Sequence, residues 1–323
     1  MACPPYEFLW IVKESAYNTQ KGSLVAGTDS IYVRLSGANR FGMRAVAKKL
    51  KIPFGGGFAS PGYAKAYQWD IMGSLELELC YSQAQLLLDW ALTPINAGQT
   101  VPWTTTEPPC DLASCVVYHG IQRDDGTIKR TRYKGVKVPS ARISSSAANG
   151  STMLQLQLRA SQKDGNAFYT TTDPDATAFP APADTAFPTD PVLFYHTNGL
   201  ISVGGALAYV TSIELNIDNH LDHQFFSSPY IVKDRKRGRS ATASANVLYT
   251  ATPNWRSDLE ALTSRAASFG WTDGTTTLTV DYQGNNLLDT LTDDLQPGQQ
   301  YMQKVDWEYQ RDTSTGDITF TLA

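Results

Sequence analysis

The stretch RSATASANVLYTATPNWRSDLEALTSRAASFG, residues 239–270, predicts a strand that leads into a capped helix. Small apolar and polar residues alternate up to Leu248, which is typical of a half-buried strand. We expect Thr252 to cap a helix whose first position is Pro253, and Gly270 to end it. The apolar stripe of this helix would consist of Trp255, Leu259, Leu262 and Ala266.

The same order of elements occurs earlier in the chain. Residues 68–81, QWDIMGSLELELCY, alternate leucine with polar residues and predict another half-buried strand. This strand leads into residues 82–92, SQAQLLLDWAL, where Ser82 can cap a short helix. The apolar face of that helix would consist of Ala84, Leu87, Leu88 and Ala91.

Each predicted helix is followed by a predicted β-hairpin. Residues 136–160 alternate on both sides of Asn149-Gly150, which is a strong signal for a tight hairpin turn. Residues 305–323 do the same around Thr315-Gly316. The sequence therefore predicts a mostly β (α+β) protein with two tandem β-sandwich or barrel domains. We expect each domain to be flanked by one short α-helix, and the two to be related by internal duplication.

A proline-rich stretch separates the two halves. Residues 164–191 hold five prolines among small residues and aspartates, which predicts an extended linker or long loop. We therefore expect the chain to have four parts. They are an N-terminal arm at 1–30, a first β domain at 31–163, the Pro-rich linker at 164–193 and a second β domain at 194–323.

Charge is spread unevenly over a chain whose formal net charge is -4. Residues 1–165 carry 18 Lys and Arg against 12 Asp and Glu, a balance of +6. Residues 166–323 carry 9 against 19, a balance of -10. The acidic half nevertheless contains a basic run of five positive charges, which are Lys233, Arg235, Lys236, Arg237 and Arg239.

Three interpretations of this basic run are open. Nucleic-acid binders place Lys and Arg against phosphates, usually interleaved with aromatic residues when they bind single strands. A charged strand edge, in contrast, discourages stray pairing between sheets. Because the run is confined to one short segment of an otherwise acidic half, we favour a third interpretation, a protein–protein contact.

The sequence gives little indication of an enzyme. It contains no G-x-S-x-G and no H-E-x-x-H motif, and the glycine-rich residues 53–62 lack the lysine of a phosphate-binding loop. His220 and His223 lie next to a strand-like stretch, so a polar turn is favoured over a metal site. We predict no catalytic residue, no cofactor and no metal.

The sequence also indicates the compartment in which the chain folds. No apolar run approaches the ~20 residues that span a bilayer. The N-terminus lacks the basic start and long apolar middle of a signal peptide. The four cysteines are too sparse for a disulfide scaffold and are expected to be reduced thiols. We therefore expect no membrane insertion, and folding in the cytoplasm of the cell that makes the protein.

Two stretches of the second half resemble the tail tube proteins of long-tailed bacteriophages. They are TSIELNIDNHLDHQFF, residues 211–226, and PYIVKDRKRGRSATASANVLYT, residues 229–250. In that family a strand typically ends in an Asn-rich turn, and a basic passage leads into the next strand. A capped helix and a terminal hairpin follow. The resemblance is good over 199–323 and weaker over 31–161.

The resemblance implies that each domain is a tail-tube-type β-sandwich or barrel flanked by a helix. It also implies that three copies close into a pseudo-hexameric ring, and that rings stack into a tube. Genomic DNA would pass through the lumen without sequence-specific binding. The implied partners are the protein itself and the tape measure, tail terminator and distal tail proteins. The protein would belong to the virion tail and assemble in the cytoplasm of the host bacterium.

Two segments are expected to contact other copies under this interpretation. The basic run from Lys233 to Arg239 would dock on an acidic patch of a neighbouring subunit or ring. Tyr6, Phe8 and Trp10 would belong to an arm that packs on an adjacent ring. The alternative is that these aromatic residues form the first strand of domain 1.

Other functions compete with the tail tube. The nearest is a distal tail or baseplate ring protein, and a secretion-system tube is a further relative of the same class. A two-domain carbohydrate-binding protein is the alternative from a different class, because β-sandwiches with Trp and Tyr often bind glycans.

Overall fold

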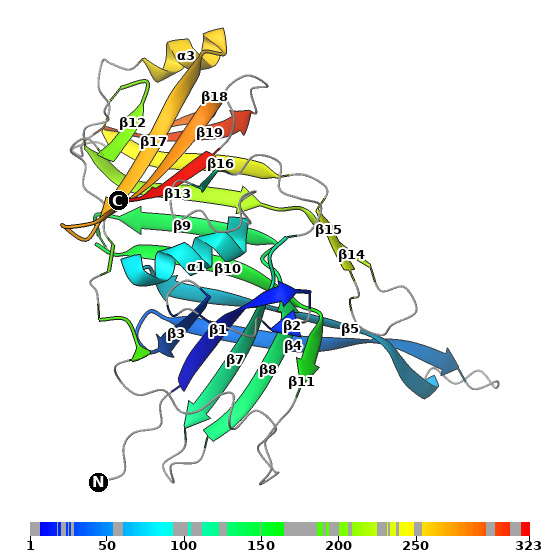
Figure 1. Ribbon diagram of the computed structural model, residues 1–323. Coiled ribbons are helices and arrows are strands. Elements are labelled where there is room, and N and C mark those ends of the chain that lie inside the picture. The colour runs from blue at the N-terminus through cyan, green and yellow to red at the C-terminus, as the bar shows by residue number, and fades with distance from the viewer. Residues whose placement is uncertain are drawn as a thin grey trace.

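The computed structural model describes residues 7–17, 19–20, 24, 26, 29–53, 61–92, 103–104, 112–122, 128–148, 150–164, 186–189, 192–193, 200–205, 209–224, 231, 233–236, 239–248, 254–294, 301–310 and 318–323. Over these residues the chain is mostly β, as the sequence predicts. Figure 1 shows a long row of strands that runs through both halves, with helix α1 lying against it.

The described elements are strands with one short helix in each half. In the first half they are β1 (Glu7–Ala16), β2 (Thr19–Gln20), β3 (Ser30–Leu35), β4 (Arg40–Pro53), β5 (Pro61–Glu78), α1 (Tyr81–Leu92), β6 (Trp103–Thr104), β7 (Cys115–Gln122), β8 (Ile128–Val136), β9 (Ser140–Ser146), β10 (Thr152–Ala160) and β11 (Gln162–Asp164). In the second half they are β12 (Ile201–Val203), β13 (Val210–Asp218), β14 (Leu221–Gln224), β15 (Lys233–Lys236), β16 (Ser240–Leu248), α3 (Trp255–Ala261), β17 (Ser264–Thr272), β18 (Thr277–Asp294), β19 (Met302–Gln310) and β20 (Ile318–Leu322).

Eight strands of one twelve-stranded antiparallel sheet form a continuous row that crosses from the first half into the second. Their order is β4-β5-β10-β9-β13-β16-β19-β18, and we call them the inner sheet. The halves meet where β9 pairs with β13, over seven residue pairs from Ser146↔Ser212 to Ser140↔Asp218. The two predicted domains are therefore joined by continuous backbone pairing as well as by the linker.

Each half covers one face of the inner sheet with a second layer. In the first half this outer layer is β11-β8-β7-β1-β2, with β3 beside β1. In the second half it consists of β12, β17, β20 and the first part of β18. A single core cluster contains apolar residues of both halves, among them Leu75, Leu156 and Trp307. Burial of this shared apolar surface stabilises the layers against one another.

Both halves connect their strands in the same way. In the first half β5 leads into α1, then β7 and β8 pair in the outer layer, β9 and β10 pair in the inner sheet, and β11 pairs back on β8. In the second half β16 leads into α3, and β17 pairs with the first part of β18. The last part of β18 then pairs with β19, and β20 pairs back on β18. Strands of one half therefore have counterparts in the other.

The strand and helix predicted for the first half are confirmed, although the helix begins at Tyr81, so Ser82 lies within it and does not cap it. Leu75, Leu77 and Leu79 are fully buried, and α1 follows directly. The helix is covered on more sides than its predicted face, because Leu86 and Trp90 are buried as well. The following hairpin is also confirmed, since β9 pairs with β10 across a turn that includes residue 150.

Helix α3 is shorter than the helix predicted for the second half. Its N-cap is Asn254 rather than Thr252, and the Asn254 side chain accepts a hydrogen bond from the backbone N–H of Ser257. Leu262 adopts the left-handed conformation that ends the helix. Residues 264–272, which include the predicted stop at Gly270, form strand β17, because the chain turns back there and pairs with β18.

The predicted C-terminal hairpin is wrong. β19 pairs with β16 and β18 in the inner sheet, whereas β20 pairs with β18 and β6 in the outer layer. The proposed turn at Thr315-Gly316 lies outside the described residues. Apolar and polar residues alternate along both strands because each strand buries one face. This alternation does not identify the strand with which each one pairs.

The N-terminal segment is a strand of the outer layer, and this corrects the prediction of an arm. β1 lies between β3 and β7 and pairs with both. Phe8 and Trp10 have exposed fractions of 0% and 8%, so they pack within their own chain. Tyr6 lies outside the described residues. The sequence pattern was ambiguous because a dense run of aromatic residues suits a core strand as well as a contact surface.

Part of the predicted linker also packs against the fold. The Leu193 side chain is fully buried. Its N–H donates to the Leu79 carbonyl at 2.8 Å, and its carbonyl accepts from the Thr152 N–H at 2.8 Å. The end of the linker therefore contributes backbone bonds between the end of β5 and the start of β10.

Candidate functional site

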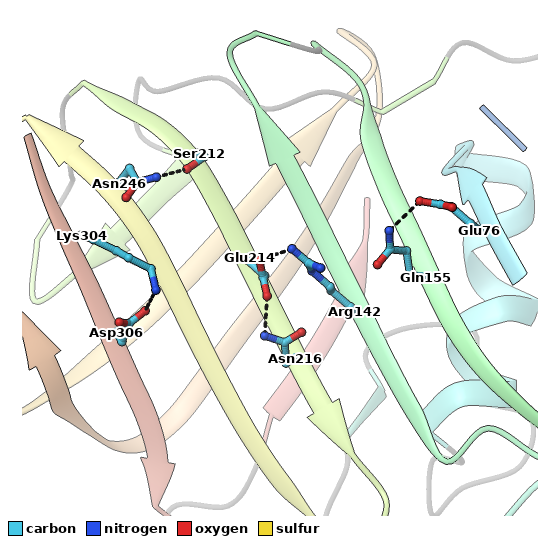
Figure 2. A network of polar contacts seen from close by, with 9 residues as sticks. All are labelled: Glu76, Arg142, Gln155, Ser212, Glu214, Asn216, Asn246, Lys304 and Asp306. Atoms are coloured by element: carbon cyan, nitrogen blue, oxygen red, sulfur yellow. Dashed lines mark hydrogen bonds and ion pairs between the residues drawn. The ribbon is translucent and has the colours of Figure 1, made fainter. Parts of the chain in front are cut away.

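One face of the inner sheet is polar along strands of both halves. Residues alternate in and out along each strand, so apolar residues enter the core and their polar neighbours point away from it. Figure 2 shows part of this polar face. The residues drawn there are Glu76, Arg142, Gln155, Ser212, Glu214, Asn216, Asn246, Lys304 and Asp306.

The junction of the two halves carries an ion pair on this face. The guanidinium of Arg142 on β9 contacts the carboxylate of Glu214 on β13. The Asn216 side chain donates to the same carboxylate at 2.8 Å. The pair therefore bridges the β9–β13 seam, and the amide holds Glu214 in place beside it.

Further basic groups of the polar face lie next to carboxylates. Arg159 on β10 donates twice to Asp70, at 2.9 and 2.5 Å, in the bidentate geometry that a guanidinium favours. Lys304 lies 3.1 Å from Asp306, which also accepts a hydrogen bond from Thr290 at 2.7 Å. These cations are compensated within the face, so they offer little unpaired positive charge to a phosphate chain.

The rest of the polar face consists mainly of small hydroxyl and amide side chains. Gln155 donates to Glu76 at 2.6 Å, and Asn246 donates to Ser212 at 2.7 Å. Two shallow open hollows lie over the β9–β13 junction and are lined largely by serine, asparagine and glutamine. Such a surface is hydrated and is neither strongly charged nor apolar. It suits a molecule that moves along it better than a ligand that binds tightly.

The two edges of the inner sheet carry opposite charge. Among the described residues, β4 pairs only with β5, and residues 288–294 of β18 pair only with β19. β4 contains five basic and no acidic residues, whereas residues 288–294 contain three aspartates and no base. Unpaired backbone groups of an edge strand are a template for another strand. These edges were not among the contacts predicted from the sequence, although the lysines and arginines over 40–51 are a signal for one of them.

The basic run lies partly on a separate hairpin. β14 and β15 pair with each other and with no other described strand, with Asp222 opposite Arg235 and His223 opposite Asp234. Figure 1 shows this hairpin at the end of β13, beyond the inner sheet. Lys233, Arg235 and Lys236 belong to β15, and Arg237 lies outside the described residues.

Arg239 makes side-chain contacts within its own chain that its sequence context does not indicate. Its Nε donates to Asn219 Oδ1 at 2.8 Å, and its Nη2 donates to the carbonyl of Leu92 at 2.5 Å. The buried Asn219 in turn donates to the carbonyls of Ala91 and Val138, each at 2.8 Å. A cation and an amide thus satisfy carbonyls at the C-terminal end of α1. These contacts give Arg239 a role within its own chain.

The aromatic residues of β1 form a cluster in the outer layer. The Trp10 ring stacks on Tyr32 and Tyr118, with centroid distances of 5.6 and 5.2 Å. Phe8 packs over Gly120, where an added Cβ would lie 2.5 Å from the Phe8 ring. This close approach explains why a glycine stands at the centre of β7.

Burial shifts the pKa values of several titratable groups in the first outer layer, among them His119 and Cys115. Burial lowers the pKa of His119, and the neighbouring Glu7 carboxylate opposes this shift. Burial raises the pKa of the Cys115 thiol well above its usual value, so this thiol stays protonated and unreactive.

The described residues contain no group of three or more His, Cys, Asp or Glu that could hold a metal ion. Over the same residues, no helix is long and apolar enough to cross a membrane.

The family model of phage tail tube proteins matches residues 8–321, which is nearly the whole chain. The match begins within β1 and ends within β20, so it includes both halves and the segment predicted as an arm. No curated protein matches the chain.

Proposed function

The chain belongs to the phage tail tube protein family, and we propose that three copies of it close into a pseudo-hexameric ring that stacks into a DNA-conducting tube. As a member of this family it is a structural component of the phage tail and therefore of the virion. The number of copies, the ring and the passage of DNA are the proposal.

The observation that carries the proposal is the inner sheet, whose two edge strands, β4 and residues 288–294 of β18, pair on one side only among the described residues. Its eight strands alternate in direction, so β4 at one edge runs opposite to β18 at the other. Head-to-tail copies can therefore pair β18 with β4 of the next copy and extend the sheet without changing its antiparallel pattern. Each chain supplies two similar units, so three chains would supply the six units of a ring.

Charge favours the same arrangement. The strand segment 288–294, which contains three aspartates, would pair with the basic strand β4 of the neighbouring copy. The overall balances of +6 and -10 likewise place opposite signs at each contact between a first and a second half. An exposed ion pair contributes only about 0–1 kcal/mol, so backbone pairing between the edges must supply most of the cohesion.

The polar face of the inner sheet would line the lumen. Arg142, Arg159 and Lys304 are compensated by carboxylates on the same face. Around the β9–β13 junction such a surface would not hold phosphates by counterion release, so DNA would remain mobile there and would make no sequence-specific contacts.

The basic hairpin β14–β15 would act in stacking. It extends beyond the inner sheet, and Lys233, Arg235 and Lys236 give it a positive charge suited to an acidic patch on a neighbouring subunit or ring. At the ends of the tube we expect contacts with the tape measure, tail terminator and distal tail proteins. Assembly would take place in the host bacterial cytoplasm, and we expect neither catalysis nor a cofactor.

The common connectivity of the two halves supports an origin by internal duplication. In this view a fused pair of tail-tube units replaced two separate subunits, and the β9–β13 pairing is an intersubunit contact that became internal.

Sedimentation velocity and negative-stain microscopy of the purified protein test the proposal. We expect trimeric rings at moderate concentration and filaments of uniform width at higher concentration. A species that stays monomeric at all concentrations and ionic strengths would overturn it, as would rings with a copy number other than three.

A further inference from the structure

We infer that the contact between neighbouring chains copies the register of the β9–β13 seam and reverses the placement of its charges. The inference rests on the ring of the proposed function, but it adds which residues of β18 and β4 face each other. It uses the seam within the chain as the template for the seam between chains.

The two halves can be aligned through buried pairs of the inner sheet. In the first half the Leu79 N–H donates a hydrogen bond to the Thr152 carbonyl, and in the second half Val247 faces Gln303. All four side chains are buried, and we take the two pairs as counterparts. A second landmark is the place where the chain leaves the inner sheet. There the backbone of Lys137 is hydrogen-bonded to the backbone of Arg159 in the first half, and Asn285 faces Gln310 in the second.

Both landmarks give the same alignment of strands. Thr152 and Arg159 of β10 then correspond to Gln303 and Gln310 of β19, with the same spacing between them. By the same alignment β9 corresponds to residues 288–294 of β18, and β13 corresponds to β4.

The alignment assigns the residues at the intermolecular seam. Ile143 faces Leu215 in the seam within the chain. The counterpart of Ile143 is Leu291, since each faces the corresponding residue of β10 or β19. The counterpart of Leu215 is Phe41, since each faces the corresponding residue of β16 or β5. Leu291 would therefore face Phe41 of the next copy.

The local packing at both edges agrees with this pair. Leu291 and Phe41 are half-buried apolar residues that pack against the rim of the core cluster. In the assigned register they would meet and extend the core across the seam, as Ile143 and Leu215 do inside the chain. The flanking residues would place Thr290 opposite Gly42 and Thr292 opposite Arg40.

The seam within the chain and the proposed seam between chains carry their charges on opposite strands. Within the chain, the base is Arg142 on β9 and the acid is Glu214 on β13. The counterpart of Glu214 is the base Arg40 on β4, and the counterpart of Arg142 is Thr290 on β18, which has the acid Asp289 beside it in sequence. If β9 paired with β4 of another copy, Arg142 would approach Arg40. If β18 paired with β13, Asp289 would approach Glu214. Each edge therefore repels the wrong partner, which keeps chains from exchanging halves during assembly.

Disulfide trapping in assembled rings tests the register. Thr290→Cys combined with Gly42→Cys places the two thiols opposite each other, and an added Cβ at Gly42 meets no atom within 4 Å in the monomer. The matched control combines Thr290→Cys with Val46→Cys, which lies four residues further along β4 at an exposed position. Cys3, Cys80 and Cys110 are replaced by serine, and the buried Cys115 is kept.

Under mild oxidation we expect the Thr290→Cys/Gly42→Cys pair to give covalent dimers and closed trimers on a non-reducing gel. The yield should exceed that of the Val46→Cys control at least fivefold, because disulfides require Cβ atoms about 3.5–4.5 Å apart. Rings in which the control pair links better, or in which neither pair links, would overturn the register while the proposed function stands. Absence of rings in the parent protein would overturn both.

Hydrogen exchange of the unmodified chain gives a second readout that needs no substitution. On ring formation we expect slower exchange of amides within residues 288–294 and within 40–43. Protection of β11 or β2 instead would place the contact in the outer layer and contradict the inference.

Discussion

The guanidinium of Arg239 donates to the carbonyl oxygen of Leu92 at 2.5 Å, although the two residues belong to different halves of the chain. Leu92 is the last residue of α1, and Arg239 directly precedes β16. The contact therefore ties the helix of the first half to the sheet of the second. It stabilises the same junction that β9 and β13 form by backbone pairing.

Replacement of this arginine should weaken the junction. We expect Arg239→Ala to lower the free energy of unfolding by about 2–4 kcal/mol, because it removes two charge-assisted hydrogen bonds and leaves buried acceptors unsatisfied. Chemical denaturation measures the effect. Arg256→Ala is the matched control, since Arg256 is exposed on α3 and should change stability by less than about 0.5 kcal/mol. Equal effects of the two substitutions would contradict the role of Arg239.

Charge reversal at the edge strand β4 should prevent ring closure. We expect Arg40→Glu to reduce the ring fraction at least tenfold and to leave the monomer folded, because Arg40 is exposed in the single chain. Sedimentation velocity at low salt measures the ring fraction, and circular dichroism verifies the fold. Arg256→Glu makes the same change in charge away from the edge and should assemble normally. Since salt screens exposed charges, the difference should shrink at high ionic strength.

The basic hairpin can be separated from ring closure. We expect the triple variant Lys233→Glu, Arg235→Glu and Lys236→Glu to form rings but no filaments, because the hairpin lies beyond the inner sheet. Electron microscopy distinguishes the two states. Filaments of normal length in this variant would show that the hairpin does not act in stacking.

Acid should weaken the outer layer of the first half through His119. Burial lowers the pKa of this histidine below its ordinary value of 6.5. The unfolded chain therefore takes up a proton at a higher pH than the folded chain, so stability is lost as the pH falls below about 6.5. The loss cannot exceed the linkage of one proton, about 1.4 kcal/mol per pH unit. His119→Gln should flatten the fall of Tm between pH 6.5 and 5, and an unchanged slope would contradict the assignment.

The core position of β1 predicts the effect of changes at the N-terminus. We expect Phe8→Ala to lower the free energy of unfolding by about 3–5 kcal/mol, since a fully buried ring is lost. Deletion of residues 1–17 should make the protein insoluble, because it removes β1 from between β3 and β7. A soluble deletion variant that only fails to stack would instead support an arm.

The sequence predicted those elements that local patterns determine. The alternation of Leu75, Leu77 and Leu79 identified β5, and the apolar face after it identified α1. The left-handed turn at Leu262 escaped prediction, because a non-glycine residue gives no local signal for it. As a result α3 was predicted too long, and β17 was missed.

Pairings between distant segments were beyond the reach of local patterns. Whether β19 and β20 pair as a hairpin depends on the layer in which each strand lies. Apolar and polar residues alternate along both strands whether or not the two strands pair with each other. The basic run shows the same limit for the candidate site. Arg239 and Lys233 look alike in sequence, but Arg239 bonds across the junction within the chain whereas Lys233 lies on the hairpin.

The β9–β13 seam has a consequence for the kinetics of assembly. In a ring of six units built from three chains, every second joint is present before any collision occurs, held at the high effective concentration of a covalent tether. Ring nucleation then requires a meeting of three bodies instead of six. The onset of polymerisation should accordingly depend less steeply on protein concentration than it would for a tube built from single units.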